Sequence, residues 1–211
     1  MKKNLLLFLF IFCVFSGYAQ VGSVEVSTGG FSFIPAFTSK EPNVILNAGT
    51  NPSKKLTANF MLMTRIKSMT PNTFVIMTRY KLINRKFKTI VGVHIPALQI
   101  SADYQTVTSF FGQELTLSYP LSKKWNVGAF VLNGKGRNTD FKALFTALNA
   151  FHSADKWGFL SQVYYLDAGN LTGAAETITY DLNKKFQLKG FANYTVTDQS
   201  FIGTVGVKYT L

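Results

Sequence analysis

The chain ends in the stretch Phe201-Ile-Gly-Thr-Val-Gly-Val-Lys-Tyr-Thr-Leu211, in which bulky apolar residues alternate with small or polar ones. Successive side chains of a β-strand point to opposite faces, so Phe201, Val205 and Tyr209 would share one face. Thr204 and Lys208 would share the other. The stretch therefore predicts a strand with one apolar and one polar face.

The same period of two recurs at residues 185–196 and 55–66. Each segment has about ten residues, the length that a tilted strand needs to cross a membrane. Extending the pattern gives twelve expected strands, at 29–37, 43–50, 55–66, 73–83, 86–100, 108–121, 124–134, 141–151, 157–167, 172–182, 185–196 and 201–211. The fold class expected is all-β, a transmembrane antiparallel up-and-down barrel. Prolines interrupt the first two segments, so ten strands are an alternative, and 141–151 also fits a helical period.

Short polar segments of similar sequence separate some of these strands. Tyr119-Pro-Leu-Ser-Lys-Lys-Trp125 and Tyr180-Asp-Leu-Asn-Lys-Lys-Phe186 share one spacing, and Tyr80-Lys-Leu-Ile-Asn-Arg-Lys-Phe87 is a copy with one extra residue. Each fits a strand end, a tight turn and a strand start. We expect them to be periplasmic hairpins, because membrane barrels keep short turns on that side.

Residues 1–20 have the pattern of a secretory signal peptide. Lys2 and Lys3 precede an apolar run from Leu5 to Phe15, and small residues follow up to Ala19. The run is shorter than the roughly 20 residues of a membrane-spanning helix. Because the one cysteine, Cys13, lies within it, the remaining barrel domain, residues 21–211, has no thiol for a disulfide or a metal site.

The composition limits the classes of partner. Lys and Arg number 22 against 10 Asp and Glu, a formal net charge of +12. A basic balance is typical of proteins that bind nucleic acid or anionic membranes. Export argues against nucleic acid, which leaves anionic lipid headgroups or an anionic solute.

Alternation alone does not distinguish a membrane barrel from a soluble one, in which the apolar face points inward. Aromatic residues close to the expected turns favour a membrane, because membrane barrels carry aromatic girdles at the lipid interfaces. The expected girdle consists of Tyr80, Tyr119, Trp125, Trp157, Tyr180, Phe186 and Tyr209. Twelve strands would also enclose a lumen that apolar side chains fill poorly.

These features resemble those of small Gram-negative outer-membrane β-barrel proteins. The resemblance rests on the signal ending Tyr18-Ala-Gln20, the repeated Tyr-x-Leu-x-Lys-Lys-aromatic turns and the terminal Val207-Lys-Tyr-Thr-Leu211. It implies an outer-membrane location, contact with outer-membrane lipid, and handling by the barrel-insertion machinery during biogenesis. Such barrels often end in an aromatic residue, whereas this chain ends in Leu211 with Tyr209 on the same face.

The polar face would then line an aqueous lumen, with Arg65, His94 and Gln187 among its residues. Arg79, Lys88, Lys189 and Lys208 lie close to the expected turns and would form a basic zone at one level of the lumen. A ring of basic side chains favours anionic solutes. The alternative is ordinary lumen polarity, with these charges hydrated or paired to Asp181.

Candidate catalytic and metal-binding groups are few. His94 and His152 are the two histidines, and neither has the neighbours that a nucleophilic triad needs. Their separation, without cysteines, offers no metal-ligand spacing. We therefore expect no enzymatic activity, no metal and no cofactor.

The leading functional hypothesis is a narrow pore for small solutes, including anions. A closed structural or adaptor barrel that serves an unidentified protein partner is the alternative, and an outer-membrane lipid hydrolase that depends on His94 is a third. Residues 101–112 are the best candidate for a lid, a plug or a partner contact.

Overall fold

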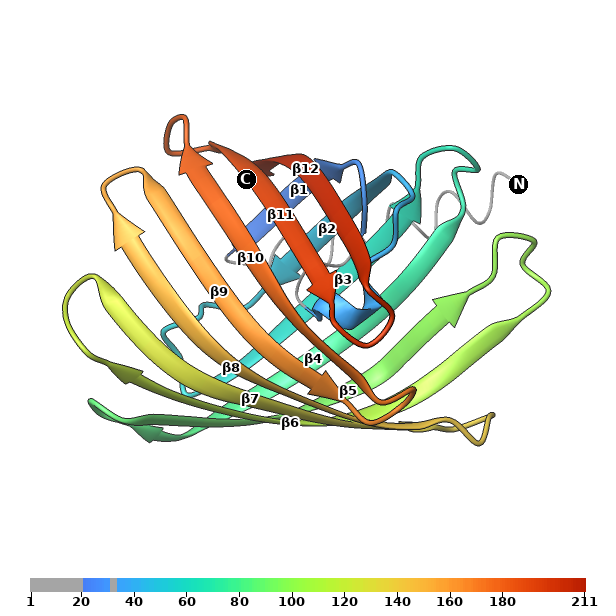
Figure 1. Ribbon diagram of the computed structural model, residues 1–211, viewed down its shortest axis with the longest axis horizontal. Coiled ribbons are helices and arrows are strands. Elements are labelled where there is room, and N and C mark those ends of the chain that lie inside the picture. Colours follow the sequence, from blue (N-terminus) through green and yellow to red (C-terminus); the bar gives the residue numbers. More distant parts are fainter. Residues whose placement is uncertain (1–20, 31–33) are drawn as a thin grey trace.

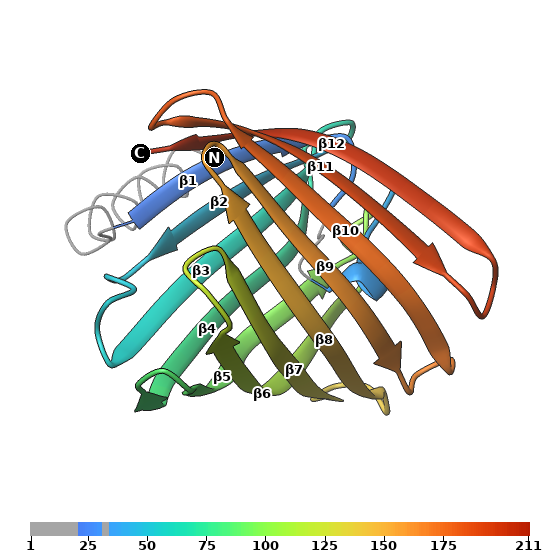
Figure 2. The same cartoon turned by 60° about the vertical axis from the view of Figure 1, so that its left-hand side comes forward.

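The computed structural model describes residues 21–30 and 34–211, which form one closed antiparallel barrel of twelve strands (Figure 1). The strands are β1 (Val21–Ser27), β2 (Asn43–Gly49), β3 (Leu56–Arg65), β4 (Pro71–Asn84), β5 (Lys88–Ile100), β6 (Val107–Pro120), β7 (Trp125–Gly136), β8 (Lys142–Ala154), β9 (Trp157–Leu166), β10 (Leu171–Asp181), β11 (Phe186–Thr195) and β12 (Ser200–Thr210). Each pairs with its neighbours in sequence, and β1 pairs with β12 to close the ring (Figure 2). The predicted all-β barrel of twelve strands is confirmed. The signal peptide predicted at 1–20 lies outside the described residues.

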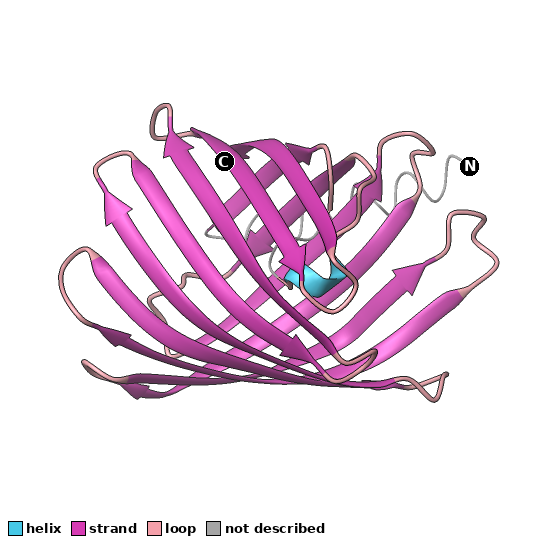
Figure 3. Cartoon of the chain, viewed as in Figure 1, coloured by secondary structure: helices cyan, strands magenta, loops and turns pink. Residues whose placement is uncertain are grey.

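A single turn of 3-10 helix, η1 (Pro35–Phe37), lies in the connection between β1 and β2 and is the one helical element of the described residues (Figure 3). Within residues 21–30 and 34–211, no helix has the length and apolar character needed to cross a membrane.

The predicted strand at 29–37 is wrong. The first strand is β1, which ends at Ser27, and residues 34–37 turn into the barrel instead. Pro35 has no backbone N–H to donate to a ladder, and the apolar side chain of Ile34 becomes 4% exposed inside the lumen. The segment 141–151 is strand β8 and not a helix, because β7 and β9 pair with it on both sides.

The predicted orientation of the faces is confirmed. On β12, Phe201 and Val205 point outward and are 62% and 64% exposed, whereas Thr204 points inward and is 7% exposed. Lys208 faces inward, where Glu25 and Gln187 are its cross-strand neighbours. The same alternation runs around the ring, because residues paired across a ladder lie on the same face.

The two ends of the barrel differ in their connections. We call one end the turn end; it holds both described chain ends and the connections 50–55, 85–87, 121–124, 155–156 and 182–185. We call the other the loop end; it holds the connections 28–42, 66–70, 101–106, 137–141, 167–170 and 196–199. Two copies of the repeated turn sequence share one structure: Ser122 Oγ accepts the backbone N–H groups of Lys124 and Trp125, and Asn183 Oδ1 accepts those of Lys185 and Phe186. A short polar side chain at this position therefore stabilises these two hairpins.

The buried apolar core lies inside the barrel, in the half nearer the loop end. One cluster gathers on β7–β9 around Phe145, Tyr164 and Leu166, and includes Ile34 from the inserted segment. A second cluster lies on β2–β4 around Met63 and Val75. Both buried apolar clusters thus lie in the loop-end half of the lumen, beside buried polar residues such as Asn43, Asn72 and Asn193.

One outward position breaks the apolar pattern and tests the orientation. Glu176 on β10 lies between Ser161 and Ala192 on the outer face. Because a charged side chain facing lipid destabilises a barrel, Glu176→Leu is expected to raise the free energy of unfolding by about 1 kcal/mol. Urea unfolding in lipid vesicles, followed by tryptophan fluorescence, measures this. Asp181→Leu, on the inner face, is the matched control and should give no such gain; equal effects at the two positions would contradict the orientation.

Candidate functional site

The most buried charges of the lumen form a cluster across β4, β5 and β6. Arg79 Nη2 donates to Glu114 Oε2 at 2.8 Å, and Arg79 Nε donates to Oε1. His94 Nε2 lies 2.7 Å from Glu114 Oε2. The Glu114 side chain is only 1% exposed, so two cationic or polar partners offset the cost of burying its charge.

A glycine makes this cluster possible. Arg79 and Glu114 lie on strands that are not adjacent, and Gly92 of β5 stands between them in register. A Cβ atom there would come within 3.0 Å of Arg79 Cγ and 3.4 Å of Glu114 Cδ. The missing side chain therefore lets the guanidinium reach over β5 to the carboxylate.

A second ion pair joins the two ends of the chain. Lys189 Nζ on β11 lies 3.0 Å from Glu25 Oε1 on β1, and again a glycine, Gly206, stands between the strands that carry them. A Cβ atom on Gly206 would meet Val26 O at 3.0 Å. Lys208 is the cross-strand partner of Glu25, so this wall carries two lysines around one carboxylate.

The four residues of the predicted basic zone all lie on the inner face, on two walls. Arg79 and Lys88 are on β4 and β5, whereas Lys189 and Lys208 are on β11 and β12, with β1–β3 between the pairs. In the alternative of ordinary lumen polarity these charges were hydrated or paired to Asp181; Asp181 Oδ1 accepts a hydrogen bond of 2.7 Å from Gln187 Nε2.

The sequence analysis did not identify two carboxylates of the site. Glu114 and Glu25 occupy inward positions of β6 and β1 and hold Arg79 and Lys189. The alternation of Phe110, Gly112, Glu114 and Thr116 places Glu114 on the polar face and was the available signal. Glu25 lay outside the predicted strands, because the first strand was placed too late in the sequence.

Arg65 has a structural role at the loop end. Its guanidinium donates to Glu41 Oε2 at 3.1 Å, to Asn72 Oδ1 at 3.1 Å and to the backbone oxygen of Ile100 at 3.0 Å. These contacts tie the connection before β2 to the ends of β3, β4 and β5. Arg65 therefore anchors loops near the mouth of the lumen.

The segment that occupies the lumen is 34–39, which we call the plug segment, and not the predicted 101–112. Ile34 packs against Phe130, Phe145, Tyr164 and Leu166, on the inner faces of β7–β9. Figures 1 and 2 both show η1 within the ring of strands. Residues 101–106 form a loop-end hairpin connection, and 107–112 belong to β6.

Hydrogen bonds hold the plug segment to the wall. Asn193 Nδ2 donates to Pro35 O at 3.4 Å, and Tyr164 Oη donates to Asn193 Oδ1 at 3.0 Å. Asn193 is 3% exposed and Tyr164 is 2% exposed. Buried hydrogen bonds from Tyr164 to Asn193 and from Asn193 to Pro35 thus fix the position of the plug segment against β9 and β11.

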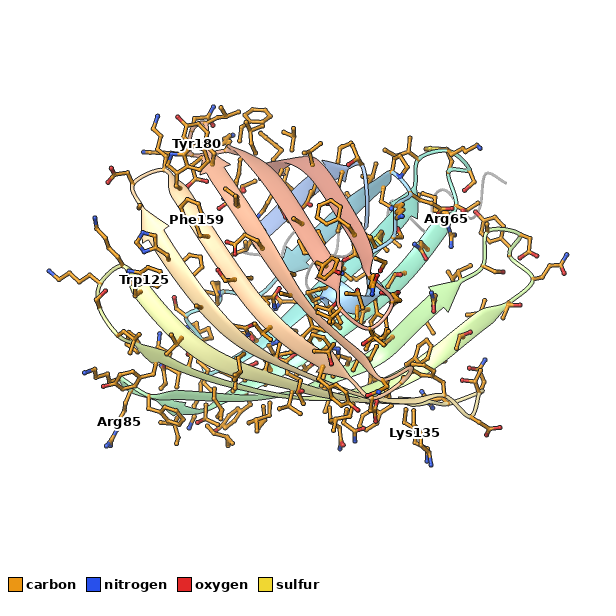
Figure 4. All side chains as sticks on the ribbon, in the orientation of Figure 1. Arg65, Arg85, Trp125, Lys135, Phe159 and Tyr180 are labelled. Carbon is orange, nitrogen blue, oxygen red and sulfur yellow. The ribbon has the colours of Figure 1, made fainter. Side chains whose placement is uncertain are left out.

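Aromatic side chains gather on the outer face at the turn end. Figure 4 shows Trp125, Phe159 and Tyr180 toward the same end as Arg85, with Arg65 and Lys135 at the opposite end. Ring centroids lie 4.6 Å apart for Trp157 and Tyr180, and 4.9 Å apart for Phe186 and Tyr209. Lysine Nζ atoms lie near the rings of Tyr80, Tyr119 and Tyr209, at 5.0, 4.9 and 5.7 Å. The seven residues of the predicted girdle lie at the turn-end ends of their strands, and a girdle in contact with lipid stays a prediction.

The histidines have different surroundings. His94 faces the lumen, whereas His152 lies against Trp125 on the outer face, with their ring centroids 4.4 Å apart and the rings tilted by 33°. In the part of the chain that the structure describes, no three His, Asp or Glu side chains are grouped as metal ligands. His94 is bonded to Glu114 inside the barrel, a position that does not favour action on membrane lipid.

The comparisons with known proteins show the fold. The KdgM porin is similar over 90% of this chain and 98% of its own, with a TM-score of 0.67 at 9% identity. A NanC porin structure is similar over 90% of this chain and 100% of its own, with a TM-score of 0.63 at 12% identity. The fold is that of these porin barrels. No protein-family model matches the sequence, and the search of curated proteins gave no match.

The buried cluster makes a prediction about stability. Glu114→Gln removes the carboxylate from Arg79 and His94 and is expected to lower the free energy of unfolding by about 3 kcal/mol. Glu41→Gln is the matched control, because Glu41 pairs with Arg65 while 62% exposed; its cost should stay below about 1 kcal/mol. Urea unfolding in vesicles compares the two, and equal small costs would show that the cluster does not stabilise the barrel.

Proposed function

We propose that the chain is an outer-membrane β-barrel that forms a narrow pore for small solutes and prefers anions. The apolar outer face and the aromatic side chains at the turn end support the location, because lipid requires both. The fold shared with the KdgM and NanC porins supports a pore. Ile34 of the plug segment packs inside the lumen in the β7–β9 cluster, which supports a narrow passage.

The main support for anion preference is the net positive charge of the turn-end half of the lumen. Inward basic residues outnumber inward carboxylates there: Arg79, Lys81, Lys88, Lys189 and Lys208 against Glu25, Glu114 and Asp181. Glu114 and Glu25 neutralise Arg79 and Lys189 in part, and the excess remains positive. Low-dielectric walls focus such a potential and raise the local concentration of anions.

The plug segment favours a second candidate, the closed structural or adaptor barrel. Ile34 is 4% exposed and a hydrogen bond from Asn193 holds Pro35 to the wall, so the segment fills part of the lumen. A barrel of this kind would show no conductance and would copurify with a stoichiometric partner.

Planar-bilayer recording decides between them. The purified barrel is expected to conduct, and its reversal potential in a KCl gradient should have the sign of chloride preference. Lys189→Gln combined with Lys208→Gln should move the anion-to-cation permeability ratio toward or below unity, because Glu25 is left without both lysines. Lys135→Gln with Lys142→Gln, outside the lumen near the loop end, is the matched control and should leave selectivity unchanged. Absence of conductance, or cation preference in the unmodified barrel, would contradict the pore.

A further inference from the structure

The loop-end half of the lumen contains a cavity of about 680 Å³ whose wall is mainly apolar. Met61, Met63, Val75 and Met77 form one side, and Leu132 and Phe145 form another. Ala36 and Phe37 of the plug segment complete the lining. The volume is within the range of about 300–1,000 Å³ that is typical of small-molecule sites.

Such a wall does not suit a purely hydrophilic solute. Apolar surface in contact with water is unfavourable, and a sugar or an inorganic ion would leave this surface hydrated without covering it. A solute with an apolar body would cover it. Methionine side chains are flexible and polarizable, so the three on this wall adapt to aromatic or aliphatic groups of different shape.

The polar end of the cavity sets the chemistry of the other part of the solute. His94 lies at the boundary of the cavity toward the turn end, and its Nε2 is bonded to Glu114, which also holds Arg79. Beyond this cluster lies the half of the lumen in which basic residues are in excess. An anionic headgroup would therefore point toward the turn end, with its apolar body in the cavity.

We propose that this cavity binds small amphipathic organic anions, a carboxylate with an aromatic or short aliphatic body, on their way through the barrel. The inference rests on the proposed pore and names its class of solute. Hydrophilic anions of the same charge gain the electrostatic attraction but not the burial of apolar surface, so they bind more weakly.

The methionines provide a direct readout. The chain has five methionines, of which Met61, Met63 and Met77 line the cavity, while Met69 lies in a loop-end connection and is 74% exposed. Methyl NMR of methionine-labelled barrel in lipid nanodiscs is titrated with 3-phenylpropanoate, and with D-galacturonate as the hydrophilic anion. Saturable shifts at the three cavity methyls with 3-phenylpropanoate, and little change at Met69, are expected. No saturable shift, equal shifts at Met69, or equal shifts with galacturonate would overturn the proposal.

A variant pair tests the apolar wall itself. Leu132→Gln places an amide in the wall and should weaken binding of 3-phenylpropanoate about tenfold or more, whereas Leu132→Met preserves the apolar character and should bind as the unmodified barrel does. Equal affinity of all three proteins would contradict the site. If Leu132→Gln fails to fold, the titration of the unmodified barrel still decides.

The same preparation, recorded in planar bilayers, distinguishes the two levels of the proposal. Anion-selective conductance without shifts at the cavity methyls would leave the pore standing and overturn the inference. Saturable shifts without conductance would support the binding site and overturn the pore.

Discussion

Hydrogen bonds between β1 and β12 close the barrel, and the division of every strand into an inner and an outer face follows from that closure. A closed ladder leaves no strand edge with unpaired backbone groups, a condition that hydrocarbon imposes on any spanning sheet. Once the ring is closed, the period of two along each strand assigns alternate side chains to lipid and to the lumen. A slip of one residue would reverse that assignment, so closure and register stabilise the same arrangement.

The interior shows how a small barrel places charge and apolar surface in one lumen. Gly92 leaves room for Arg79 to reach past the intervening strand β5 to Glu114, and Lys189 reaches Glu25 past β12. These pairs lie toward the turn end, whereas the plug segment and the apolar clusters occupy the loop end. A solute would meet the apolar clusters and the ion pairs one after the other along the barrel. This arrangement suits a solute with both an apolar body and a charged group better than a solute that is only charged.

Strand alternation and turn chemistry were sufficient to predict strands β2–β12 and the orientation of the faces, because these depend on local patterns. The plug segment was not predictable from them. Residues 29–37 are apolar enough for a strand, and only the distant surface around Phe145 and Tyr164 favours burial of Ile34 inside the lumen. The register shift between His94 and Ala97 also turns both side chains inward, against the period of two. The ion pair of Arg79 with Glu114 required knowing that β4 and β6 flank Gly92.

The most direct test of the account is a pair of nitroxide labels on adjacent residues of β8. Leu148, which is 68% exposed, faces outward, and Asn149 pairs with Gly128 and Gln162 on the inner face. The only cysteine is Cys13, in the predicted signal segment, so Leu148→Cys and Asn149→Cys are single labelling sites in the barrel domain. In lipid vesicles, electron paramagnetic resonance should show the label at 148 colliding mainly with oxygen dissolved in the bilayer, and the label at 149 mainly with a water-soluble nickel complex. The reverse preference, or equal access of the nickel complex to both labels, would contradict a lipid-facing outer surface.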